Sequence, residues 1–253
     1  MLPILARYGP FFLYSFTVAA GLGLLAALAL TAWRARRTAR PRRSARPYPG
    51  WLDGVLLGLL LGLVGGRLLF AAVNWDYFQL HNSEIWRWQQ GSSYHGFLGG
   101  GLATFWLWAR WTGRDWRSYA DLVAPGLLLA AAFVWLGCLL DGAAYGRETV
   151  ISLFSADLPD KLGVAGVRYQ TQLGGIVWSL FWLGLVWGLR GRLHGGRLFW
   201  LALGGITLGR LLLSFLRGDP VPMLAAWRLD SVVDAAVLLV AAIGLFQRQT
   251  QAP

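Results

Sequence analysis

The chain has 253 residues, of which 56% are hydrophobic and 14% charged, and its formal net charge is +11. A soluble domain of this length needs far less apolar side chain to build one core, so the composition predicts an integral membrane protein. The basic residues gather in connections between apolar stretches rather than on a polar domain, which argues against nucleic acid as the partner and favours anionic headgroups.

Seven apolar stretches have the length needed to cross roughly 30 Å of hydrocarbon. They cover residues 10–32, 51–73, 95–111, 119–140, 172–189, 197–216 and 229–246. This pattern predicts an all-α integral membrane protein with seven transmembrane helices. No polar segment is long enough to fold separately, so we expect a single helical membrane domain over residues 1–253.

Arginine placement predicts the orientation of these helices. The first, third and fifth connections carry the arginine-rich segments 34–46, 110–117 and 190–197. The other connections hold fewer basic residues, mixed with acidic ones. Because cytoplasmic flanks of membrane helices collect positive residues, we expect the N-terminus outside and the C-terminus in the cytoplasm.

The spans and their connections show two further patterns, one of aromatic residues and one of glycines. Aromatic residues in the outward connection 74–94 predict a short interfacial helix over residues 82–88. Glycines recur within the spans, and they allow either close helix packing or room for a lipid tail. They are Gly62, Gly65, Gly66, Gly99, Gly100, Gly101, Gly204 and Gly205.

His95 begins the shortest predicted span and is the strongest candidate for a catalytic residue. An ionisable side chain at a membrane boundary is costly to dehydrate, and histidine exchanges protons near neutral pH. The alternative is an imidazole that only hydrogen-bonds at the interface. The three histidines lie on different predicted sides of the membrane, so we expect no shared metal site. No glycine-rich nucleotide loop precedes a helix in a soluble domain, so we expect no cofactor either.

Arg67 and Arg210 fall inside predicted spans, and Arg217 lies near the outer end of one. An arginine at mid-bilayer depth costs about 2.5 kcal/mol or more unless it meets an anion or a wet cavity. Guanidinium groups bind phosphate well, so a phospholipid headgroup is the expected partner. The alternative is internal pairing with Asp121, Asp141 or Asp234.

A polar patch around Asp141, Gly142 and Arg147 follows the fourth predicted span on the outward side. Together with His95 and the arginines, this patch predicts phospholipid headgroup chemistry at the outer leaflet. The residues indicate a class of substrate but no reaction.

Five runs of the sequence resemble motifs of one known family in both order and spacing. They are residues 66–70 (Gly-Arg-Leu-Leu-Phe), 93–99 (Ser-Tyr-His-Gly-Phe-Leu-Gly), 121–125 (Asp-Leu-Val-Ala-Pro), 171–173 (Thr-Gln-Leu), and Arg210 with Arg217. They are similar to the runs Gly-Ala-Arg-Leu, Ser-Phe-His-Gly-Gly-Leu-Gly, Asp-Leu-Ala-Pro, Pro-Thr-Gln-Leu-Tyr-Glu and Arg-x-x-x-Glu-x-x-Arg of prolipoprotein diacylglyceryl transferases.

The resemblance implies a seven-span enzyme of the bacterial cytoplasmic membrane. It implies transfer of diacylglycerol from phosphatidylglycerol to the lipobox cysteine in the signal peptide of lipoprotein precursors. In the implied mechanism arginines hold the lipid phosphate and His95 takes the proton of the cysteine thiol. The thiolate attacks the glyceryl carbon and glycerol phosphate leaves. Tyr14 or Tyr8 corresponds to the family's first-span tyrosine, and Gln172 belongs to a substrate-binding motif.

The chain departs from the family pattern at several motif positions. The fourth-span motif Gly-Arg-x-Gly-Asn-x-x-Asn-Gly-Glu corresponds to residues 134–143, and the family's glutamates also follow Thr-Gln-Leu and separate the paired arginines. The replacing residues are Trp135, Cys138, Asp141, Ala143, Gly175 and Ser214. With the motif arginine absent, its role would pass to Arg210 and Arg147, with Arg67 as a further candidate. The alternative is a catalytically impaired homologue that binds lipid or supports a membrane complex.

Overall fold

The computed structural model describes residues 3–9, 11–37, 48–87, 91–151, 153–159 and 163–247, and it is mostly helical. The chain divides into two compact units. The larger unit combines Met1–Arg40 with Ala120–Pro253, and the smaller unit is Pro41–Tyr119. The single domain expected from the sequence stays a prediction.

Long helices account for most of both units. The larger unit contains α1 (Ser15–Arg37), most of α5 (Trp116–Asp141), α6 (Thr171–Leu189), α7 (Arg197–Ser214) and α8 (Leu229–Phe246), and the smaller unit contains α2 (Trp51–Val73) and α4 (Tyr94–Trp111). Six of these helices, all except α4, are long and apolar enough to cross a membrane. The prediction of a helical integral membrane protein is confirmed, and the count of seven spans and their orientation stay predictions.

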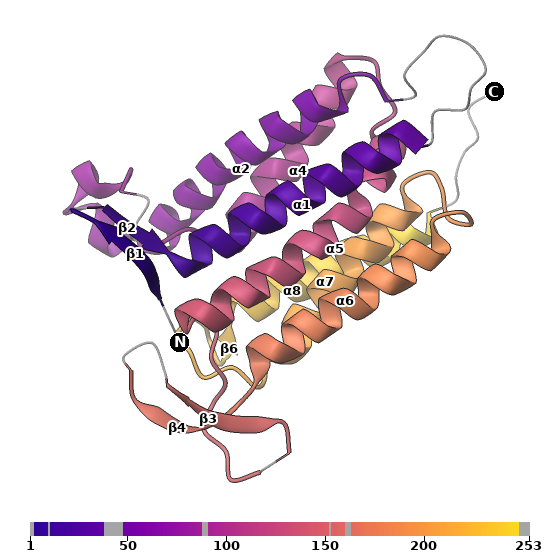
Figure 1. The fold of residues 1–253 in the computed structure, drawn as a ribbon. Coiled ribbons are helices and arrows are strands. Elements are labelled where there is room, and N and C mark those ends of the chain that lie inside the picture. Colours follow the sequence, from indigo (N-terminus) through magenta and orange to yellow (C-terminus); the bar gives the residue numbers. More distant parts are fainter. Residues whose placement is uncertain are drawn as a thin grey trace. The chain divides into compact units, whose positions relative to one another are not determined.

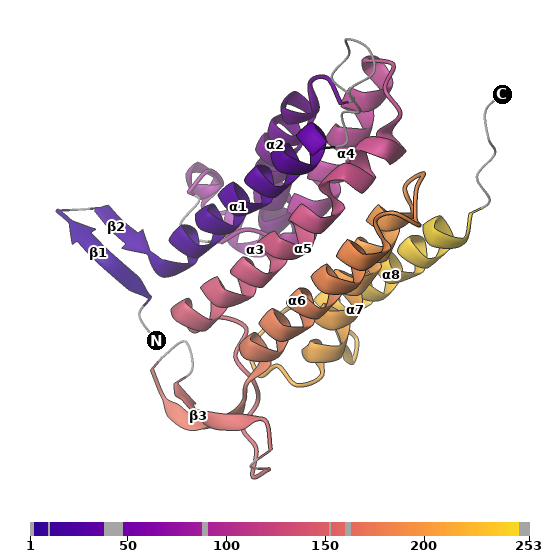
Figure 2. The same cartoon turned by 45° about the vertical axis from the view of Figure 1, so that its right-hand side comes forward.

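The described chain also contains three short antiparallel hairpins, all in the larger unit, which the all-α prediction did not include. They are β1 (Ile4–Tyr8) with β2 (Phe11–Tyr14), β3 (Ser155–Pro159) with β4 (Ala165–Tyr169), and β5 (Met223–Leu224) with β6 (Trp227–Arg228). The first two lie at the end of the unit where α1 begins and α5 ends (Figures 1 and 2).

The first hairpin corrects the predicted start of the first span. The apolar run from residue 10 predicted a helix there, whereas α1 begins at Ser15 and residues 11–14 form β2. Hydropathy alone does not separate a short apolar strand from the first turn of an apolar helix. Gly9, at a φ of 61°, adopts the left-handed conformation of a tight turn between the strands.

In the smaller unit, the connection after α2 contains the short helix α3 (Trp75–Phe78) and the 3-10 turn η1 (Asn82–Glu84). The interfacial helix predicted over 82–88 is therefore reduced to one turn, and residue 88 lies outside the described residues. The carbonyls of Glu84 and Ile85 accept hydrogen bonds from the Arg67 side chain. This use of the carbonyls competes with continued helix in this segment.

The glycines of α2 and α4 form a closely packed seam. A methyl group on Gly65 would lie 2.7 Å from the Gly96 carbonyl oxygen, and one on Gly62 would lie 2.9 Å from the carbonyl oxygen of Phe97. Such spacing allows the two backbones to touch, as small residues do in membrane helix pairs. Close helix packing therefore explains Gly62 and Gly65. It does not explain Gly99, because a Cβ added at that position would have no neighbour within 4 Å.

A second packing pattern explains why the sequence is rich in both tryptophan and glycine. Several indole rings lie directly on a glycine of a neighbouring helix, in the space that a side chain would fill. These pairs are Trp108 on Gly54, Trp135 on Gly175, Trp178 on Gly209, Trp182 on Gly205, and Trp200 on Gly244. Each glycine therefore serves as the flat surface for one ring.

Helices α1 and α5 lie side by side (Figures 1 and 2), and a proline links them. Pro125 lies inside α5 and has no N–H, so the carbonyl of Asp121 lacks its helical donor. The Arg34 guanidinium of α1 donates to this carbonyl at 2.9 Å. An arginine of one helix thus satisfies the acceptor that the proline of the other leaves open.

The Asp121 side chain supports the start of α7. Its carboxylate accepts hydrogen bonds from the backbone N–H groups of Gly196 at 2.8 Å and Phe199 at 2.9 Å. These are orphan donors at a helix N-terminus, where the helix dipole also favours a negative charge. Asp121 therefore caps α7 from a neighbouring helix.

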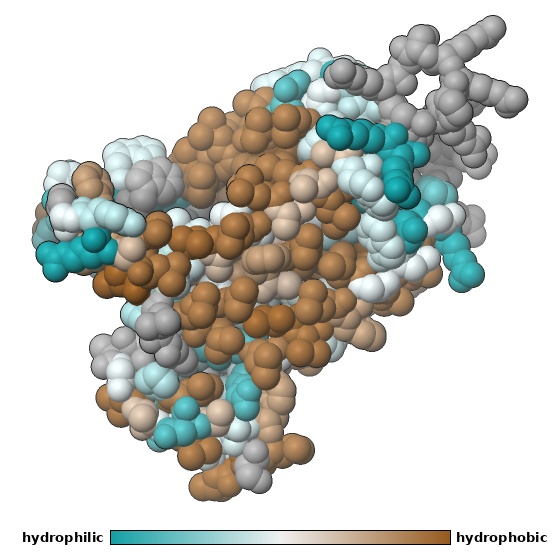
Figure 3. All heavy atoms as spheres, in the orientation of Figure 1, coloured by the Kyte–Doolittle hydropathy of each residue, from teal (hydrophilic) through white to brown (hydrophobic). Residues whose placement is uncertain are grey.

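The helices of the larger unit leave much apolar surface uncovered by protein. In the candidate span of α8 only 17% of the residues are buried within the protein. Exposed large apolar side chains also cover α6, and brown apolar atoms extend along the helices in Figure 3. Such a surface is stable against lipid tails and unfavourable in water.

Candidate functional site

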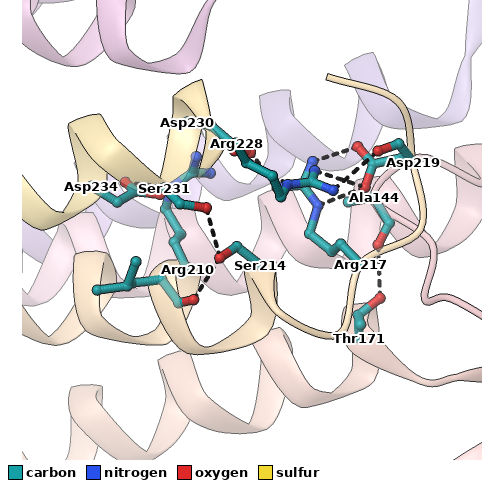
Figure 4. A network of polar contacts seen from close by, with 11 residues as sticks. Ala144, Thr171, Arg210, Ser214, Arg217, Asp219, Arg228, Asp230, Ser231 and Asp234 are labelled. Carbon is teal, nitrogen blue, oxygen red and sulfur yellow. Dashed lines mark hydrogen bonds and ion pairs between the residues drawn. The ribbon is translucent and has the colours of Figure 1, made fainter. Parts of the chain in front are cut away.

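An arginine-rich cluster joins the end of α7 to the start of α8 in the larger unit (Figure 4). It contains a pocket of about 280 Å³, whose lining includes Arg147, Ser214, Phe215, Arg217, Arg228 and Ser231. Both helices are candidate membrane spans. The pocket therefore lies at the end of two spans, beside the connection that joins them.

Arg210 lies inside α7 and forms an ion pair with Asp234 of α8. Its Nε lies 3.2 Å from Oδ1 of Asp234, and the Asp234 side chain is 2% exposed. This contact is the internal pairing that the sequence left open as the alternative to a lipid anion. A buried pair of this kind depends on both partners, because either charge alone would remain desolvated and uncompensated.

Arg217 and Arg228 share two carboxylates. Arg217 contacts Asp219 at 2.5 Å and Asp230 at 3.2 Å, and Arg228 contacts each of them at 3.4 Å. Burial opposes the charge of Arg217, but the hydrogen bond to Asp219 and the two negative charges outweigh it, so its pKa is raised above the ordinary value. The network holds the β5–β6 hairpin against the ends of both helices.

Two buried serines form the wall between these ion pairs. The Ser231 hydroxyl donates to the hydroxyl oxygen of Ser214 at 2.8 Å, and Ser214 donates to the Leu211 carbonyl at 2.7 Å. Both serines line the pocket. The pocket thus carries neutral hydroxyl groups between its charged residues.

Arg147 enters the same pocket from the connection after α5. Its backbone N–H donates to Leu216 O at 2.8 Å, and its carbonyl accepts from Tyr169 N. Its guanidinium lies over the Tyr169 ring at 5.8 Å, and among the described residues it contacts no carboxylate. Arg147 also lines a second, open hollow of about 670 Å³ beside β4. Of the arginines that line the 280 Å³ pocket, Arg147 is therefore the best placed to receive an anion.

Thr171 and Gln172 fix the loop that leads to Arg147. Gln172 is fully buried, and its Nε2 donates to the Ala143 carbonyl at 3.0 Å. Thr171 donates to the Ala144 carbonyl at 2.7 Å, and Ala144 adopts a φ of 53°. The side-chain amide of Gln172, a predicted substrate-binding residue, thus donates a hydrogen bond to the backbone of the loop.

Asp141 and Gly142 lie at the start of this loop. Asp141 is the last residue of α5 and is partly buried, and Gly142 adopts a φ of 78°. The left-handed glycine ends the helix and turns the chain towards Arg147. The polar patch predicted from the sequence is therefore a helix end followed by a strained turn.

Arg67 is completely buried in the smaller unit. Its guanidinium donates to the carbonyls of Glu84 and Gly91 at 2.8 Å each, and its Nε to that of Ile85. The rings of Phe70 and Phe78 lie 5.4 and 5.2 Å away. Backbone carbonyls are thus partners of Arg67, whereas the partners expected from the sequence were a lipid phosphate or an aspartate.

His95 lies in the first turn of α4, also in the smaller unit. Ser93 caps this helix by accepting from Gly96 N at 3.4 Å, and its own N–H donates to Gly66 O at 2.9 Å. The Tyr94 ring stands edge-on to the imidazole at 5.3 Å. His95 and Arg67 therefore belong to segments that touch, while the other predicted site residues lie in the larger unit.

The candidate tyrosines lie in the first hairpin rather than in a helix. Tyr14 is the last residue of β2 and Tyr8 the last of β1, and both side chains are exposed. Tyr14 directly precedes α1, so of the two it is nearer in sequence to the first span. The choice between them stays a prediction.

Several cluster residues were missed because they lie at the ends of elements. Arg228 and Asp230 are at the boundary of the last predicted span. A charge there costs little free energy of membrane insertion, so it does not stand out as a charge within a span does. The sequence signal was the spacing of Asp230 and Asp234, which puts both carboxylates on one face of a helix.

The fold and this cluster define a multi-pass helical membrane protein with an arginine-lined pocket of about 280 Å³ at the end of two candidate spans. The family described as prolipoprotein diacylglyceryl transferase matches residues 3–247. The chain belongs to this family, and the resemblance seen in the motifs is confirmed.

Relatives with the name phosphatidylglycerol–prolipoprotein diacylglyceryl transferase include the following three. The second such enzyme of Clostridium perfringens (strain 13 / Type A) is 32% identical over 216 residues, which cover 82% of this chain and 80% of the relative. The protein of Geobacillus kaustophilus (strain HTA426) is 30% identical over 96% of this chain and 90% of its own. That of Streptococcus equi subsp. zooepidemicus (strain H70) is 26% identical, with coverage of 98% and 96%.

Proposed function

We propose that this protein transfers the diacylglyceryl group of phosphatidylglycerol to the lipobox cysteine thiol of lipoprotein precursors. The family match and the names of the relatives support the reaction. The observation that carries the proposal is Arg147, a guanidinium without a carboxylate partner among the described residues, in a pocket beside candidate membrane spans.

The proposed setting is the bacterial cytoplasmic membrane, with the pocket at the outer leaflet. Helix α4 would be the seventh span, since its 18 residues match the minimum length and it packs along α2. The N-terminus would lie outside and the C-terminus in the cytoplasm, as the arginine pattern predicts. Two substrates, an anionic lipid and a membrane-bound signal peptide, then meet at the same surface.

In the proposed mechanism Arg147 binds the lipid phosphate, and His95 accepts the proton of the precursor thiol. The thiolate attacks the glyceryl carbon that carries the phosphate ester. A carbon–sulfur bond forms, the carbon–oxygen bond to phosphate breaks, and glycerol phosphate leaves with the electron pair. A thiol with a pKa near 8.5 is only a few per cent ionised at neutral pH, so a base raises the concentration of the nucleophile. The guanidinium stabilises the charge on the leaving phosphate.

The test uses purified protein in nanodiscs with phosphatidylglycerol and a lipobox peptide, and mass spectrometry of the thioether product. We expect His95→Ala to abolish product formation, while His81→Ala, a change of an exposed histidine in the same unit, leaves it intact. Arg147→Ala should raise the KM for the lipid about tenfold or more. The exposed Arg192 provides the matched control, Arg192→Ala. Product formation that is unchanged in His95→Ala would remove His95 from the mechanism. Absence of product with the unmodified protein would refute the function and favour the impaired homologue.

A further inference from the structure

Position 214 holds a serine where the family pattern Arg-x-x-x-Glu-x-x-Arg has a glutamate. It follows Arg210 by four residues and precedes Arg217 by three. On a helix the spacing of four places the two side chains together, so a carboxylate at 214 would lie within reach of Arg210. Arg217 follows three residues after the end of α7. Ser214 offers only a short neutral hydroxyl, and that hydroxyl is engaged by Ser231 and Leu211.

The carboxylates beside these arginines come instead from α8. Asp234 contacts Arg210, and Asp230 contacts Arg217. Ser231 lies between the two aspartates in sequence and bonds to Ser214 itself. Asp230, Ser231 and Asp234 thus share the face of α8 that meets α7, as Figure 4 shows.

Burial shows that the Arg210 pair is constrained. The side chains of Arg210 and Asp234 are 16% and 2% exposed, in a region where neither charge is well solvated. Isolated charges in such surroundings are strongly disfavoured, so the carboxylate restricts where the guanidinium lies. The pair adjoins the two serines that line the pocket, since Arg210 and Ser214 are one turn apart on α7.

We propose that Asp234 is the positioning residue for Arg210, and that it supplies from α8 the carboxylate that a glutamate at position 214 would supply from α7. Asp234 itself does not touch the lipid. It holds the Arg210 guanidinium close to Ser214 and Ser231, the two serines that line the pocket, so that its positive charge acts on an anionic headgroup from beside the pocket. The inference rests on the proposed function for the identity of that headgroup, phosphatidylglycerol.

The test moves the carboxylate between the two helices. Asp234→Asn removes the charge and keeps the shape, and Asp234→Asn with Ser214→Glu returns a carboxylate on α7. We expect the KM for phosphatidylglycerol to rise about tenfold in the single variant, with a smaller change in kcat, because a charge-assisted bond no longer holds Arg210. The double variant should recover most of this loss. The control is Asp121→Asn, a change of a partly buried carboxylate in the same unit, which should leave the KM unchanged.

If Asp234 had a purely structural role, Asp234→Asn would lower the melting temperature without raising the KM more than it changes kcat. Transfer of the carboxylate to α7 would then not restore the KM. An unchanged KM in Asp234→Asn, or a folded double variant with no recovery, would overturn the inference. If Asp234→Asn does not fold, Asp234→Glu keeps the charge but displaces it by one methylene. We then expect wild-type stability with a KM raised about threefold or more, and an unchanged KM would be the refuting result.

A second measurement separates this inference from the proposed reaction. The rise in melting temperature on adding phosphatidylglycerol, relative to phosphatidylcholine, reports headgroup binding without turnover. If the unmodified protein forms no product, the reaction fails. The inference then stands only if the stabilisation specific to phosphatidylglycerol is lost in Asp234→Asn and returns in the double variant. Equal stabilisation of the wild type and Asp234→Asn would refute it.

Discussion

Replacing Gly175 with alanine tests how tightly the Trp135 indole is held between α5 and α6. A Cβ at position 175 would lie 2.5 Å from Cγ of Trp135 and closer still to Cδ2 and Cε2. Carbon atoms need about 3.5 Å, so the ring must move by roughly 1 Å or more. Trp135 is only 8% exposed, and overpacking of this kind costs about 1–3 kcal/mol.

Alanine also favours a helix over glycine by up to about 1 kcal/mol, which masks part of the clash. Gly184→Ala on the same helix gives the matched control, because a Cβ at that position meets nothing within 4 Å. The difference in free energy of unfolding between the two variants isolates the clash, and we expect about 1–3 kcal/mol. The measurement is unfolding by rising SDS mole fraction in mixed micelles, followed by far-ultraviolet circular dichroism. Equal stability of Gly175→Ala and Gly184→Ala would refute the packing argument.

Three further changes are expected to alter stability in the same assay. Asp121→Ala removes the cap of α7 and should cost about 0.5–2 kcal/mol, whereas Asp121→Asn should retain most of it; equal loss in both would contradict the capping role. Arg34→Ala leaves a buried carbonyl unpaired and should cost about 1–3 kcal/mol, less when Pro125→Ala restores the helical N–H, and no rescue would exclude this explanation. Ala144→Gly relieves a left-handed backbone and should gain about 0.5–1 kcal/mol, so a loss would show that the turn is not strained.

The helices could be predicted from the sequence because a membrane span is a long, nearly uninterrupted apolar run, and each predicted stretch lies mostly within one helix. The hairpins could not, since strands of two to five residues are too short to show a period. The start of α1 illustrates the limit. Residues 11–14 are as apolar as the helix that follows, and only the pairing of β2 with β1 makes them a strand.

The site was predictable where a charge interrupts an apolar run. Arg210 and Arg217 are conspicuous for this reason, and the pairing of Arg210 with Asp234 was one of the alternatives. The partners of Arg67 and Gln172 were not predictable, because both side chains bind backbone carbonyls of loops. Every residue carries such a carbonyl, so its position depends on the fold and leaves no mark in the sequence.

Two of the departures from the family motifs, Trp135 and Gly175, fall on residues that contact each other. In a chain with arginine at 135 and glutamate at 175, the two side chains would face each other where the Trp135 ring now lies on Gly175. Loss of only one would leave a buried charge without a partner, which costs about 3–5 kcal/mol, whereas replacing both with packed apolar groups is often neutral. The serine at 214 has its counterpart in the aspartates of α8. The substitutions at positions 135, 175 and 214 therefore count as two coupled exchanges rather than as three separate defects, and they are weaker evidence against activity than their number suggests.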